Sequence, residues 1–351
     1  MDKVKSRRRV GLPALHVGFV VVTLSLLAAF ATVPSPFSAD LGDKFRWHAE
    51  LVALFARIRY DAGDRVFHDT LRGSEGWIFF AGDASLKDFQ GLGRLAPRDL
   101  EKFRRGMDKL NGYLAQRGTA LLVVIVPDKS TTYASFMPKE IPVLGSNSLR
   151  DQFVQYMNDR GNFNVLDLAP ALNKYTDQGR LYYKTDSHWN DLGAYYGYVE
   201  IMHALSRTLP QLRPRPLADF DLQWTVSQGT TDLPYIMGGL DLPEESPELR
   251  LRQPEPYSSV ATRLSTGDVM VVDINPSGPP FRVLVFGDSF SEWLRQFLVL
   301  DFGRVTTVPY HALGGDEVYS WIEREAPDVV IIEVGERLLG NLLPKFAGAG
   351  P

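Results

Sequence analysis

The stretch Ala120-Leu-Leu-Val-Val-Ile-Val126 decides the fold class. It is a continuous, largely β-branched apolar run between Gly118 and Pro127, which is typical of a strand covered on both faces. Further strand-like runs follow it along the chain, at 163–168, 282–286, 305–308 and 329–334. Helical patterns are interspersed with these runs, at 99–117, 148–159, 191–205, after 291 and at 316–325. This order predicts an α/β domain with a mostly parallel sheet, helices on both faces and a ligand site beyond the carboxyl ends of the strands.

Residues 209–280 interrupt the alternation of strands and helices. The stretch is rich in proline and has weak periodicity; its prolines are Pro210, Pro214, Pro216, Pro234, Pro243, Pro247, Pro254 and Pro256. Proline removes a backbone donor and fixes φ, so such a stretch disfavours regular elements. We predict that 209–280 is a long excursion from the sheet that covers or shapes the site, within a domain at 70–345.

Composition excludes several classes of protein. The 351 residues are 44% hydrophobic with a formal net charge of −4, and the basic residues are scattered after the first ten positions. No electrostatic footprint for nucleic acid is therefore visible. The absence of cysteine excludes disulfides, thiolate catalysis and zinc–thiolate sites.

The N-terminus has the pattern of a membrane anchor. A basic tail at 1–9 precedes an uncharged apolar run at 10–33. About 24 helical residues rise about 36 Å, enough to cross a hydrocarbon core of about 30 Å. The positive-inside rule keeps the basic tail in the cytoplasm and predicts a single-pass inner-membrane protein whose catalytic domain is periplasmic, after a helical linker at 34–69. A cleaved signal peptide ending near Ala31 is the alternative, and it also exports the domain.

Ser289 is the candidate nucleophile. In Val285-Phe-Gly-Asp-Ser289-Phe a buried strand leads into a tight turn before a helix, which exposes the hydroxyl at the sheet edge. The start of the helix offers backbone N–H groups and a positive dipole end to an oxyanion. The alternative is that Asp288, Ser289 or Ser291 only caps the helix.

Asp186 and His188 are the candidate partners of the serine, in Lys184-Thr-Asp186-Ser-His188-Trp-Asn190. A serine hydroxyl is a weak nucleophile until an imidazole takes its proton, and a carboxylate fixes the tautomer of that imidazole. One compact loop can supply both groups. Metal binding by this Asp-x-His pair is the weaker alternative, since no third ligand is evident, and we predict no metal and no cofactor. A helix cap with a surface histidine is the structural alternative.

Together these blocks resemble the SGNH hydrolase-like domain of the alginate O-acetyltransferases of the AlgJ and AlgX type. In ordinary SGNH hydrolases the Gly-Asp-Ser block lies near the start and the histidine block near the end. Here the histidine block precedes Ser289, as in the alginate-type group, and geometry rather than chain order defines a triad. Supporting blocks are similar in the same order; they lie at 73–79, 126–133, 231–235 and 332–337.

The resemblance implies roles for particular residues. Ser289 becomes the nucleophile, His188 the base and Asp186 its orienting carboxylate. Four further residues become candidates for substrate binding, while packing is the alternative for the first three; these are Lys129, Tyr133, Trp189 and Arg337. The oxyanion donor expected is the Ser289 backbone N–H. The fold implied is a three-layer, flavodoxin-like arrangement, and the short segment after Arg337 is more similar to the AlgJ arrangement than to AlgX with its carbohydrate-binding module.

The resemblance also implies a function and partners. We expect acetyl transfer through an acyl-serine to hydroxyls of an exported polysaccharide, either alginate or another exopolysaccharide. A multi-pass membrane acyltransferase is the expected source of acetyl groups. A secreted carbohydrate esterase with the same triad and a non-catalytic polysaccharide-binding subunit are the alternatives.

Overall fold

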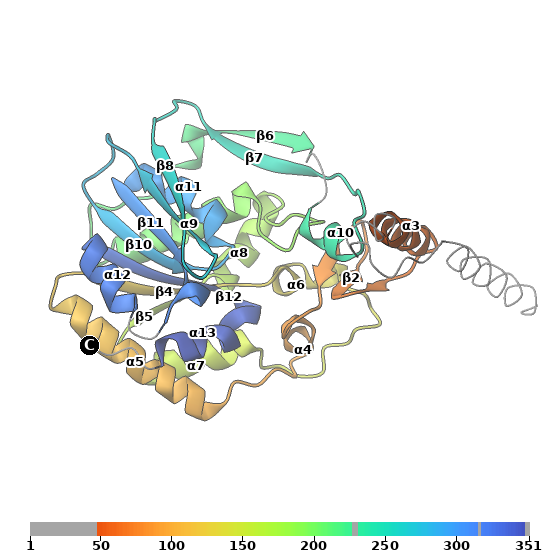
Figure 1. Cartoon of the computed structure of the whole chain (residues 1–351), viewed down its shortest axis with the longest axis horizontal. Coiled ribbons are helices and arrows are strands. Elements are labelled where there is room, and N and C mark those ends of the chain that lie inside the picture. Colours follow the sequence, from red (N-terminus) through yellow and green to blue (C-terminus); the bar gives the residue numbers. More distant parts are fainter. Residues whose placement is uncertain (1–47, 227–230, 315–316, 348–351) are drawn as a thin grey trace, which may run out of the picture. The chain divides into compact units, whose positions relative to one another are not determined.

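The computed structural model describes residues 48–226, 231–314 and 317–347 (Figure 1). The chain divides into two compact units, Met1–Leu51 and Val52–Pro351. The predicted membrane anchor at 10–33 lies outside the described residues, as does the first part of the predicted linker. Within the described ranges, no helix combines the length and the apolar character needed to cross a bilayer. Helix α3 (His48–Asp61) lies in the predicted linker.

A seven-stranded mixed sheet forms the centre of the second unit, in the order β5-β4-β12-β10-β11-β9-β8. The first five strands are parallel and include every strand that the sequence predicts; these are β5 (Asn164–Asp167), β4 (Ala120–Val126), β12 (Val329–Gly335), β10 (Arg282–Gly287) and β11 (Arg304–Pro309). Leu122 pairs with Ile331 and Ile331 pairs with Val285, so the apolar runs are in register at the centre. The predicted α/β class is confirmed.

The prediction for residues 209–280 is only partly right. Strands β8 (Ser258–Arg263) and β9 (Val269–Ile274) belong to the main sheet, where β9 runs antiparallel to β11. Strand β8 was missed because it is exposed throughout and lacks an apolar pattern, whereas the apolar β9 was included in the excursion. The true excursion is shorter; it contains β6 (Phe220–Val226), α10 (Asp232–Ile236) and β7 (Glu245–Leu251). Strands β6 and β7 pair as a separate ribbon (Figure 1).

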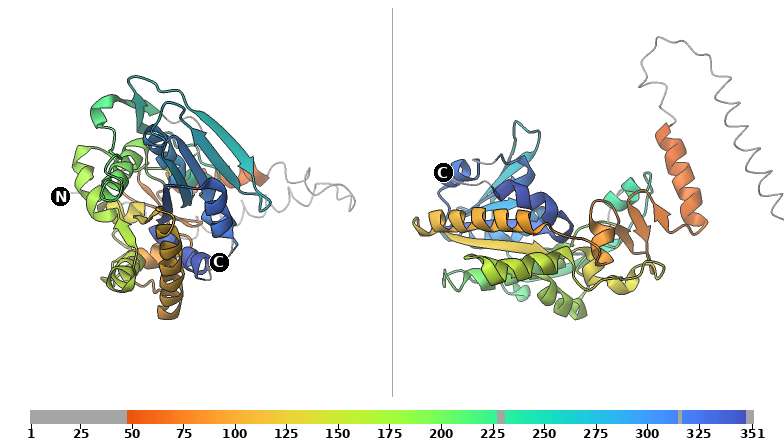
Figure 2. Two further views of the ribbon diagram at one scale, coloured as in Figure 1. Left: turned by 90° about the vertical axis from the view of Figure 1, so that its left-hand side faces the viewer. Right: turned by 90° about the horizontal axis from the view of Figure 1, so that it is seen from below.

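Helices cover both faces of the sheet (Figure 2). One face packs against α8 (Ala169–Tyr175), α9 (Asp191–Leu205) and α11 (Ser291–Asp301). The other packs against α5 (Pro97–Ala115), α7 (Leu149–Arg160), α12 (Glu317–Glu325) and α13 (Leu339–Phe346). Adjacent strand residues alternate between the two cores: Val124 faces the first and Val123 the second, and both are fully buried. Burying each such side chain stabilises the fold by about 1.5–3 kcal/mol relative to exposure.

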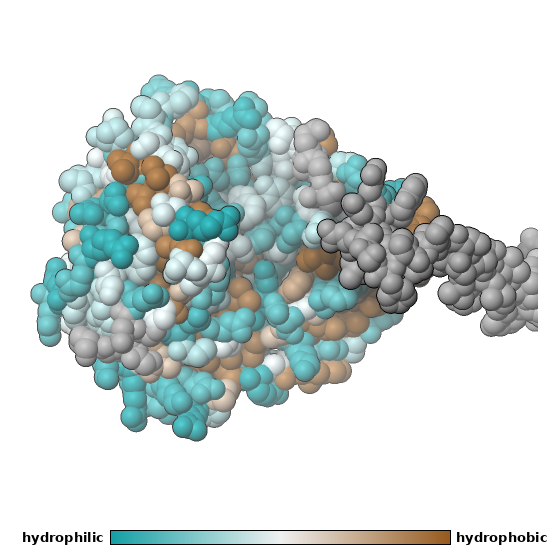
Figure 3. All heavy atoms as spheres, in the orientation of Figure 1, coloured by the Kyte–Doolittle hydropathy of each residue, from teal (hydrophilic) through white to brown (hydrophobic). Residues whose placement is uncertain are grey.

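Smaller elements lie at the carboxyl end of the sheet. A three-stranded antiparallel sheet is made of β1 (Val66–Phe67), β2 (Thr70–Arg72) and β3 (Ile78–Phe80). Short helices α4 (Ser85–Phe89) and α6 (Lys129–Thr132) accompany it. On the face shown in Figure 3, hydrophilic side chains cover much of the described surface, with hydrophobic patches between them.

Three central parallel strands end at the same edge. Strand β4 ends at Val126, β10 at Gly287 and β12 at Gly335. The residues that follow each strand are polar or charged, and they include Lys129, Ser289 and Arg337. The carboxyl edge of a parallel sheet is where such folds bind ligands.

Candidate active site

The turn that carries Ser289 is built by its immediate neighbours. A Cβ on Gly287 would approach the Ser291 Oγ to 2.8 Å and the Glu333 Oε2 to 2.9 Å, so only glycine fits at the end of β10. The Asp288 carboxylate accepts hydrogen bonds from the backbone N–H of Phe290 at 3.0 Å and of Gly335 at 2.7 Å. Asp288 therefore fixes the turn, and the Ser289 hydroxyl is not used as a helix cap.

The structure brings Ser289, His188 and Asp186 together. The His188 Nε2 lies 2.6 Å from the Ser289 Oγ, and its Nδ1 lies 2.7 Å from the Asp186 Oδ1. With a proton on Nδ1 donated to Asp186, the Nε2 lone pair faces the serine hydroxyl. This is the geometry in which an imidazole can take the serine proton.

Neighbouring groups hold the imidazole and its carboxylate. The His188 ring stacks on Trp293, with centroids 4.7 Å apart, and meets the edge of Phe290 at 5.0 Å. Asp186 also accepts the His188 backbone N–H at 3.0 Å. Although burial opposes it, hydrogen bonding from His188 keeps the pKa of Asp186 below its usual value. Asp186 is thus an anion placed to stabilise a charged imidazolium.

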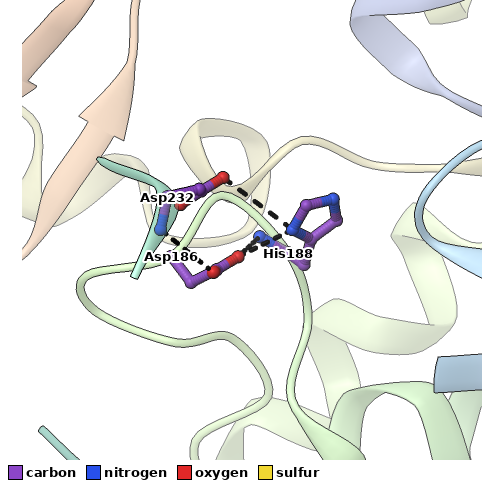
Figure 4. Close-up of side chains that lie close together, drawn as sticks. All are labelled: Asp186, His188 and Asp232. Atoms are coloured by element: carbon purple, nitrogen blue, oxygen red, sulfur yellow. Dashed lines mark hydrogen bonds and ion pairs between the residues drawn. The ribbon is translucent and has the colours of Figure 1, made fainter. Parts of the chain in front are cut away.

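A second carboxylate, Asp232, lies on the same side of the imidazole (Figure 4). Its Oδ2 is 3.9 Å from the His188 Nδ1 and accepts a short hydrogen bond from the Ser187 hydroxyl. Its Oδ1 accepts the Ser187 backbone N–H at 2.9 Å. Burial, and then the charge of Asp186, raise the pKa of Asp232. The two carboxylates therefore have different environments: one bonds the imidazole and the other bonds the loop.

The same three groups could hold a metal ion. Asp186, His188 and Asp232 each offer one ligand atom, and these atoms lie within 4.8 Å of one another. A metal at Nδ1 would take the lone pair there and leave the proton on Nε2. That tautomer cannot accept the proton of Ser289, so metal binding and general-base action are mutually exclusive uses of this imidazole.

Lys129 holds the loop that carries His188. Its Nζ donates to the backbone carbonyls of Tyr183 at 3.1 Å, Lys184 at 3.0 Å and Asp186 at 2.7 Å. The residue is 3% exposed, and desolvation lowers its pKa to about 8. The prediction that Lys129 contacts a polysaccharide is contradicted, because all three of its donors are used inside the protein.

Trp189 is also internal, and Tyr133 is largely buried. Trp189 is fully buried, and its indole N–H donates to the Phe290 carbonyl at 3.1 Å. This bond connects the loop at 182–189, the histidine loop, to the turn at 287–291, the serine turn. The Tyr133 hydroxyl accepts the Leu181 N–H at 2.9 Å, and its ring stacks on Trp77 with centroids 4.3 Å apart. The full burial of Trp189 contradicts a direct contact with a polysaccharide. Tyr133 is 9% exposed and lines a surface pocket, so its role in substrate binding stays a prediction.

Arg337 lies at the carboxyl end of β12, with its side chain 9% exposed. It bonds Asp128 at 2.8 Å and lies over the Phe290 ring, 5.4 Å from its centroid. Its guanidinium is thus committed to an internal ion pair beneath the serine turn. Arg337 also lines a small cavity with Lys129 and Ser187, and its role in substrate binding stays a prediction.

Residues that the sequence did not single out complete the site. Glu244 accepts the Lys184 N–H at 3.0 Å and the Thr185 hydroxyl at 2.6 Å. Glu244 and Trp293 were missed because each belongs to an unremarkable local pattern, although Trp293 is one helical turn beyond Ser289. Asp232 lies in the supporting block at 231–235, but the sequence did not assign it a role in the site. The expected oxyanion donor is available: among the described residues, none accepts a hydrogen bond from the Ser289 N–H.

The family model described as the SGNH hydrolase-like domain of the acetyltransferase AlgX matches residues 70–305. The chain belongs to this family. Its curated relatives include the probable alginate O-acetylase AlgJ of Pseudomonas putida KT2440, 26% identical over 163 residues that cover 46% of this chain and 39% of the relative. AlgJ of Pseudomonas aeruginosa PAO1 is 29% identical over 122 residues, which cover 35% of this chain and 29% of the relative. The matched stretches therefore span well under half of either relative.

Solved structures share the fold at low sequence identity. PatB1 of Bacillus cereus superposes with a TM-score of 0.59 at 16% identity, covering 77% of this chain and 96% of that chain. The O-acetyltransferase domain of Pseudomonas putida AlgJ gives 0.51 at 17% identity, covering 80% and 99%. AlgX of Pseudomonas aeruginosa gives 0.51 at 14% identity, covering 80% and 68%. These likenesses support the SGNH hydrolase-like fold of an AlgJ/AlgX-type protein.

Proposed function

We propose that the protein is an O-acetyltransferase that carries acetyl through Ser289 to hydroxyls of an exported polysaccharide. Membership of an acetyltransferase family supports the reaction class. The observation that carries the mechanism is the continuous hydrogen-bond chain from Ser289 Oγ through both nitrogens of His188 to Asp186, at 2.6 and 2.7 Å. The names of the relatives suggest alginate, but other exopolysaccharides fit the same chemistry.

Two acyl transfers make up the reaction. His188 Nε2 takes the hydroxyl proton as Ser289 Oγ attacks the acetyl carbonyl of the donor, and the Ser289 N–H faces the oxyanion. The imidazolium then returns the proton to the leaving oxygen and an acetyl-serine remains. A sugar hydroxyl next gives its proton to Nε2 and attacks the acetyl carbonyl. The bond from the acetyl carbon to Ser289 Oγ then breaks, the imidazolium returns the proton to Oγ, and the products are the sugar ester and free Ser289.

Water competes with the sugar at the second step. Ser289 is half-buried rather than enclosed, so an acyl-enzyme without an acceptor is open to hydrolysis. An esterase is the outcome in which water wins this competition. Close fitting of the polymer at the site excludes water and favours transfer.

The test is acetyl transfer by the full chain in detergent, with a chromogenic acetyl ester as donor and oligosaccharides as acceptors. We expect Ser289→Ala to lower ester turnover by several orders of magnitude and to abolish the acetyl adduct that mass spectrometry detects on the wild type. The remote Ser206→Ala variant is the control and should match the wild type. Unchanged turnover in Ser289→Ala would remove Ser289 from the mechanism. Acetic acid as the sole product with every acceptor would favour the esterase.

We further propose that the domain works in the periplasm, anchored by residues 10–33, and receives acetyl from a multi-pass acyltransferase of the inner membrane. The basic tail and apolar run support the anchor and its orientation. The chain has no cysteine, so Ser277→Cys places a single thiol at an exposed turn. We expect an impermeant thiol reagent to label this variant in spheroplasts. Labelling only after lysis would place the domain in the cytoplasm and contradict the proposal.

A further inference from the structure

A groove of about 630 Å³ opens beside the candidate triad. Trp293 connects the groove to the triad, because it lines the groove and its ring stacks on that of His188. Tyr183 also lines it, belongs to the histidine loop, and lies 6.3 Å from Trp293 between ring centroids. Glu292 lines the same groove and is three residues beyond Ser289. The groove therefore lies next to the place where an acceptor must meet an acetyl-serine.

The lining of the groove suits a sugar. Tyr183, Tyr257 and Trp293 offer flat apolar rings with polar edges. Between them lie carboxylate and amide side chains, which accept the hydrogens of hydroxyl groups; these side chains are Asp191, Glu248, Glu292 and Gln296.

The charge of the groove is unusual for a site that would take an acidic polymer. Three carboxylates line it, whereas Arg295 is its one basic side chain among the described residues. Arg295 bonds the buried carboxylate of Asp273 at 2.8 and 2.9 Å, so its charge is already offset. Glu292 is exposed and forms no ion pair with a described residue. Glu248 is paired with Arg250 at 2.8 Å, and both carboxylate oxygens of Asp191 accept hydrogen bonds from the protein. The uncompensated negative charge of the groove is therefore that of Glu292, within one helical turn of Ser289.

We propose that this groove binds the acceptor, and that the acceptor is a glycan of neutral or amino sugars rather than a polyuronate. The inference rests on the proposed acetyl transfer from Ser289. A polyuronate carries a carboxylate on every sugar, and like charges in a partly desolvated groove repel one another. Hydroxyl and ammonium groups instead donate to carboxylates. Repulsion of the wrong polymer gives specificity even where the contacts to neutral sugars are weak.

The test compares acceptors at a fixed concentration of the acetyl ester, with the full chain in detergent. One set is a panel of neutral and amino oligosaccharides, which are gluco-, manno-, galacto- and partly deacetylated chito-oligosaccharides. The other is oligomannuronate of matched length. We expect acetylated product mainly from the first set. Glu292→Lys should raise the ratio of oligomannuronate to neutral product about three- to tenfold, and added salt should reduce this gain because it screens exposed charges.

A matched control separates the groove from net charge. Asp159→Lys makes the same charge change on an exposed residue of α7, which packs on the other face of the sheet, and it should leave the product ratio unchanged. Oligomannuronate acetylated as well as the neutral panel, or a product ratio that Glu292→Lys does not move, overturns the inference. If either of these results is obtained while Ser289→Ala is inactive, only the inference about the acceptor fails and the proposed function stands. Full activity of Ser289→Ala instead contradicts the proposed function itself.

Discussion

The serine turn and the histidine loop meet at the candidate active site, but different kinds of contact hold each of them in place. The turn at 287–291 is held by local contacts, such as the 3.0 Å bond from the Phe290 N–H to Asp288, and by bonds to β12, such as the 2.7 Å bond from the Gly335 N–H to Asp288. The loop at 182–189 is held by side chains from elsewhere in the chain, among them Lys129, Asp232 and Glu244. The turn of the candidate nucleophile is thus partly built by its own sequence, whereas the position of the candidate base depends mainly on tertiary contacts.

This difference separates two kinds of defect. Changes at the triad itself should remove chemistry from an intact fold. Changes at the side chains that hold the loop should first cost stability, because they leave buried backbone groups without partners. The predictions below test whether the chemical and the structural roles divide in this way.

Asp186→Asn should have the largest effect. The amide cannot stabilise the imidazolium and favours the wrong tautomer, so we expect acetyl-ester turnover to fall roughly 10³- to 10⁴-fold with little change in unfolding temperature. Steady-state kinetics and thermal unfolding measure the two quantities. Asp177→Asn, at an exposed position, is the matched control. A loss below tenfold would mean that another group orients His188.

Lys129→Met should mainly lower the stability of the fold. Removing the ammonium leaves three buried carbonyls of the histidine loop without their donor, and we expect the free energy of unfolding to fall by about 3 kcal/mol. Urea unfolding followed by tryptophan fluorescence measures it. Lys184→Met is the control, because the Lys184 Nζ bonds an exposed carbonyl of Glu75, and its effect should stay below about 1 kcal/mol. Equal effects of the two variants would contradict the assigned role of Lys129.

Of these three variants, Asp232→Asn should show the smallest effect, which is a moderate loss of ester turnover. The amide oxygen can still accept the Ser187 N–H, but the negative charge 3.9 Å from the His188 Nδ1 is lost. We expect ester turnover to fall about tenfold, which corresponds to about 1.4 kcal/mol. A loss as large as that of Asp186→Asn would show that the two carboxylates share one role.

The sequence predicted the parallel core because its strands carry their own signal. The apolar run at 120–126 is continuous, and the Gly-Asp-Ser block marks a turn that its own residues build. Strand β8 was missed because it is an exposed edge strand with no apolar pattern. Strand β9 has an apolar pattern, but it was missed because it lies inside the proline-rich stretch 209–280 that we interpreted as one excursion. Lys129 and Trp189 were assigned to substrate because burial is not visible in a single sequence; the structure places both inside the fold.

The sequence alone determined the fold class, the candidate nucleophile and the loop that supplies its candidate base. The tertiary structure decided which remote side chains hold that loop, because Lys129 and Glu244 meet it only after β4 and the excursion have folded around it. It also decided the charge of the groove beside Trp293, which collects side chains from several separate segments of the chain. Periodicity and motifs report on neighbours along the chain, whereas a hydrogen bond or an electric field depends on distance in space.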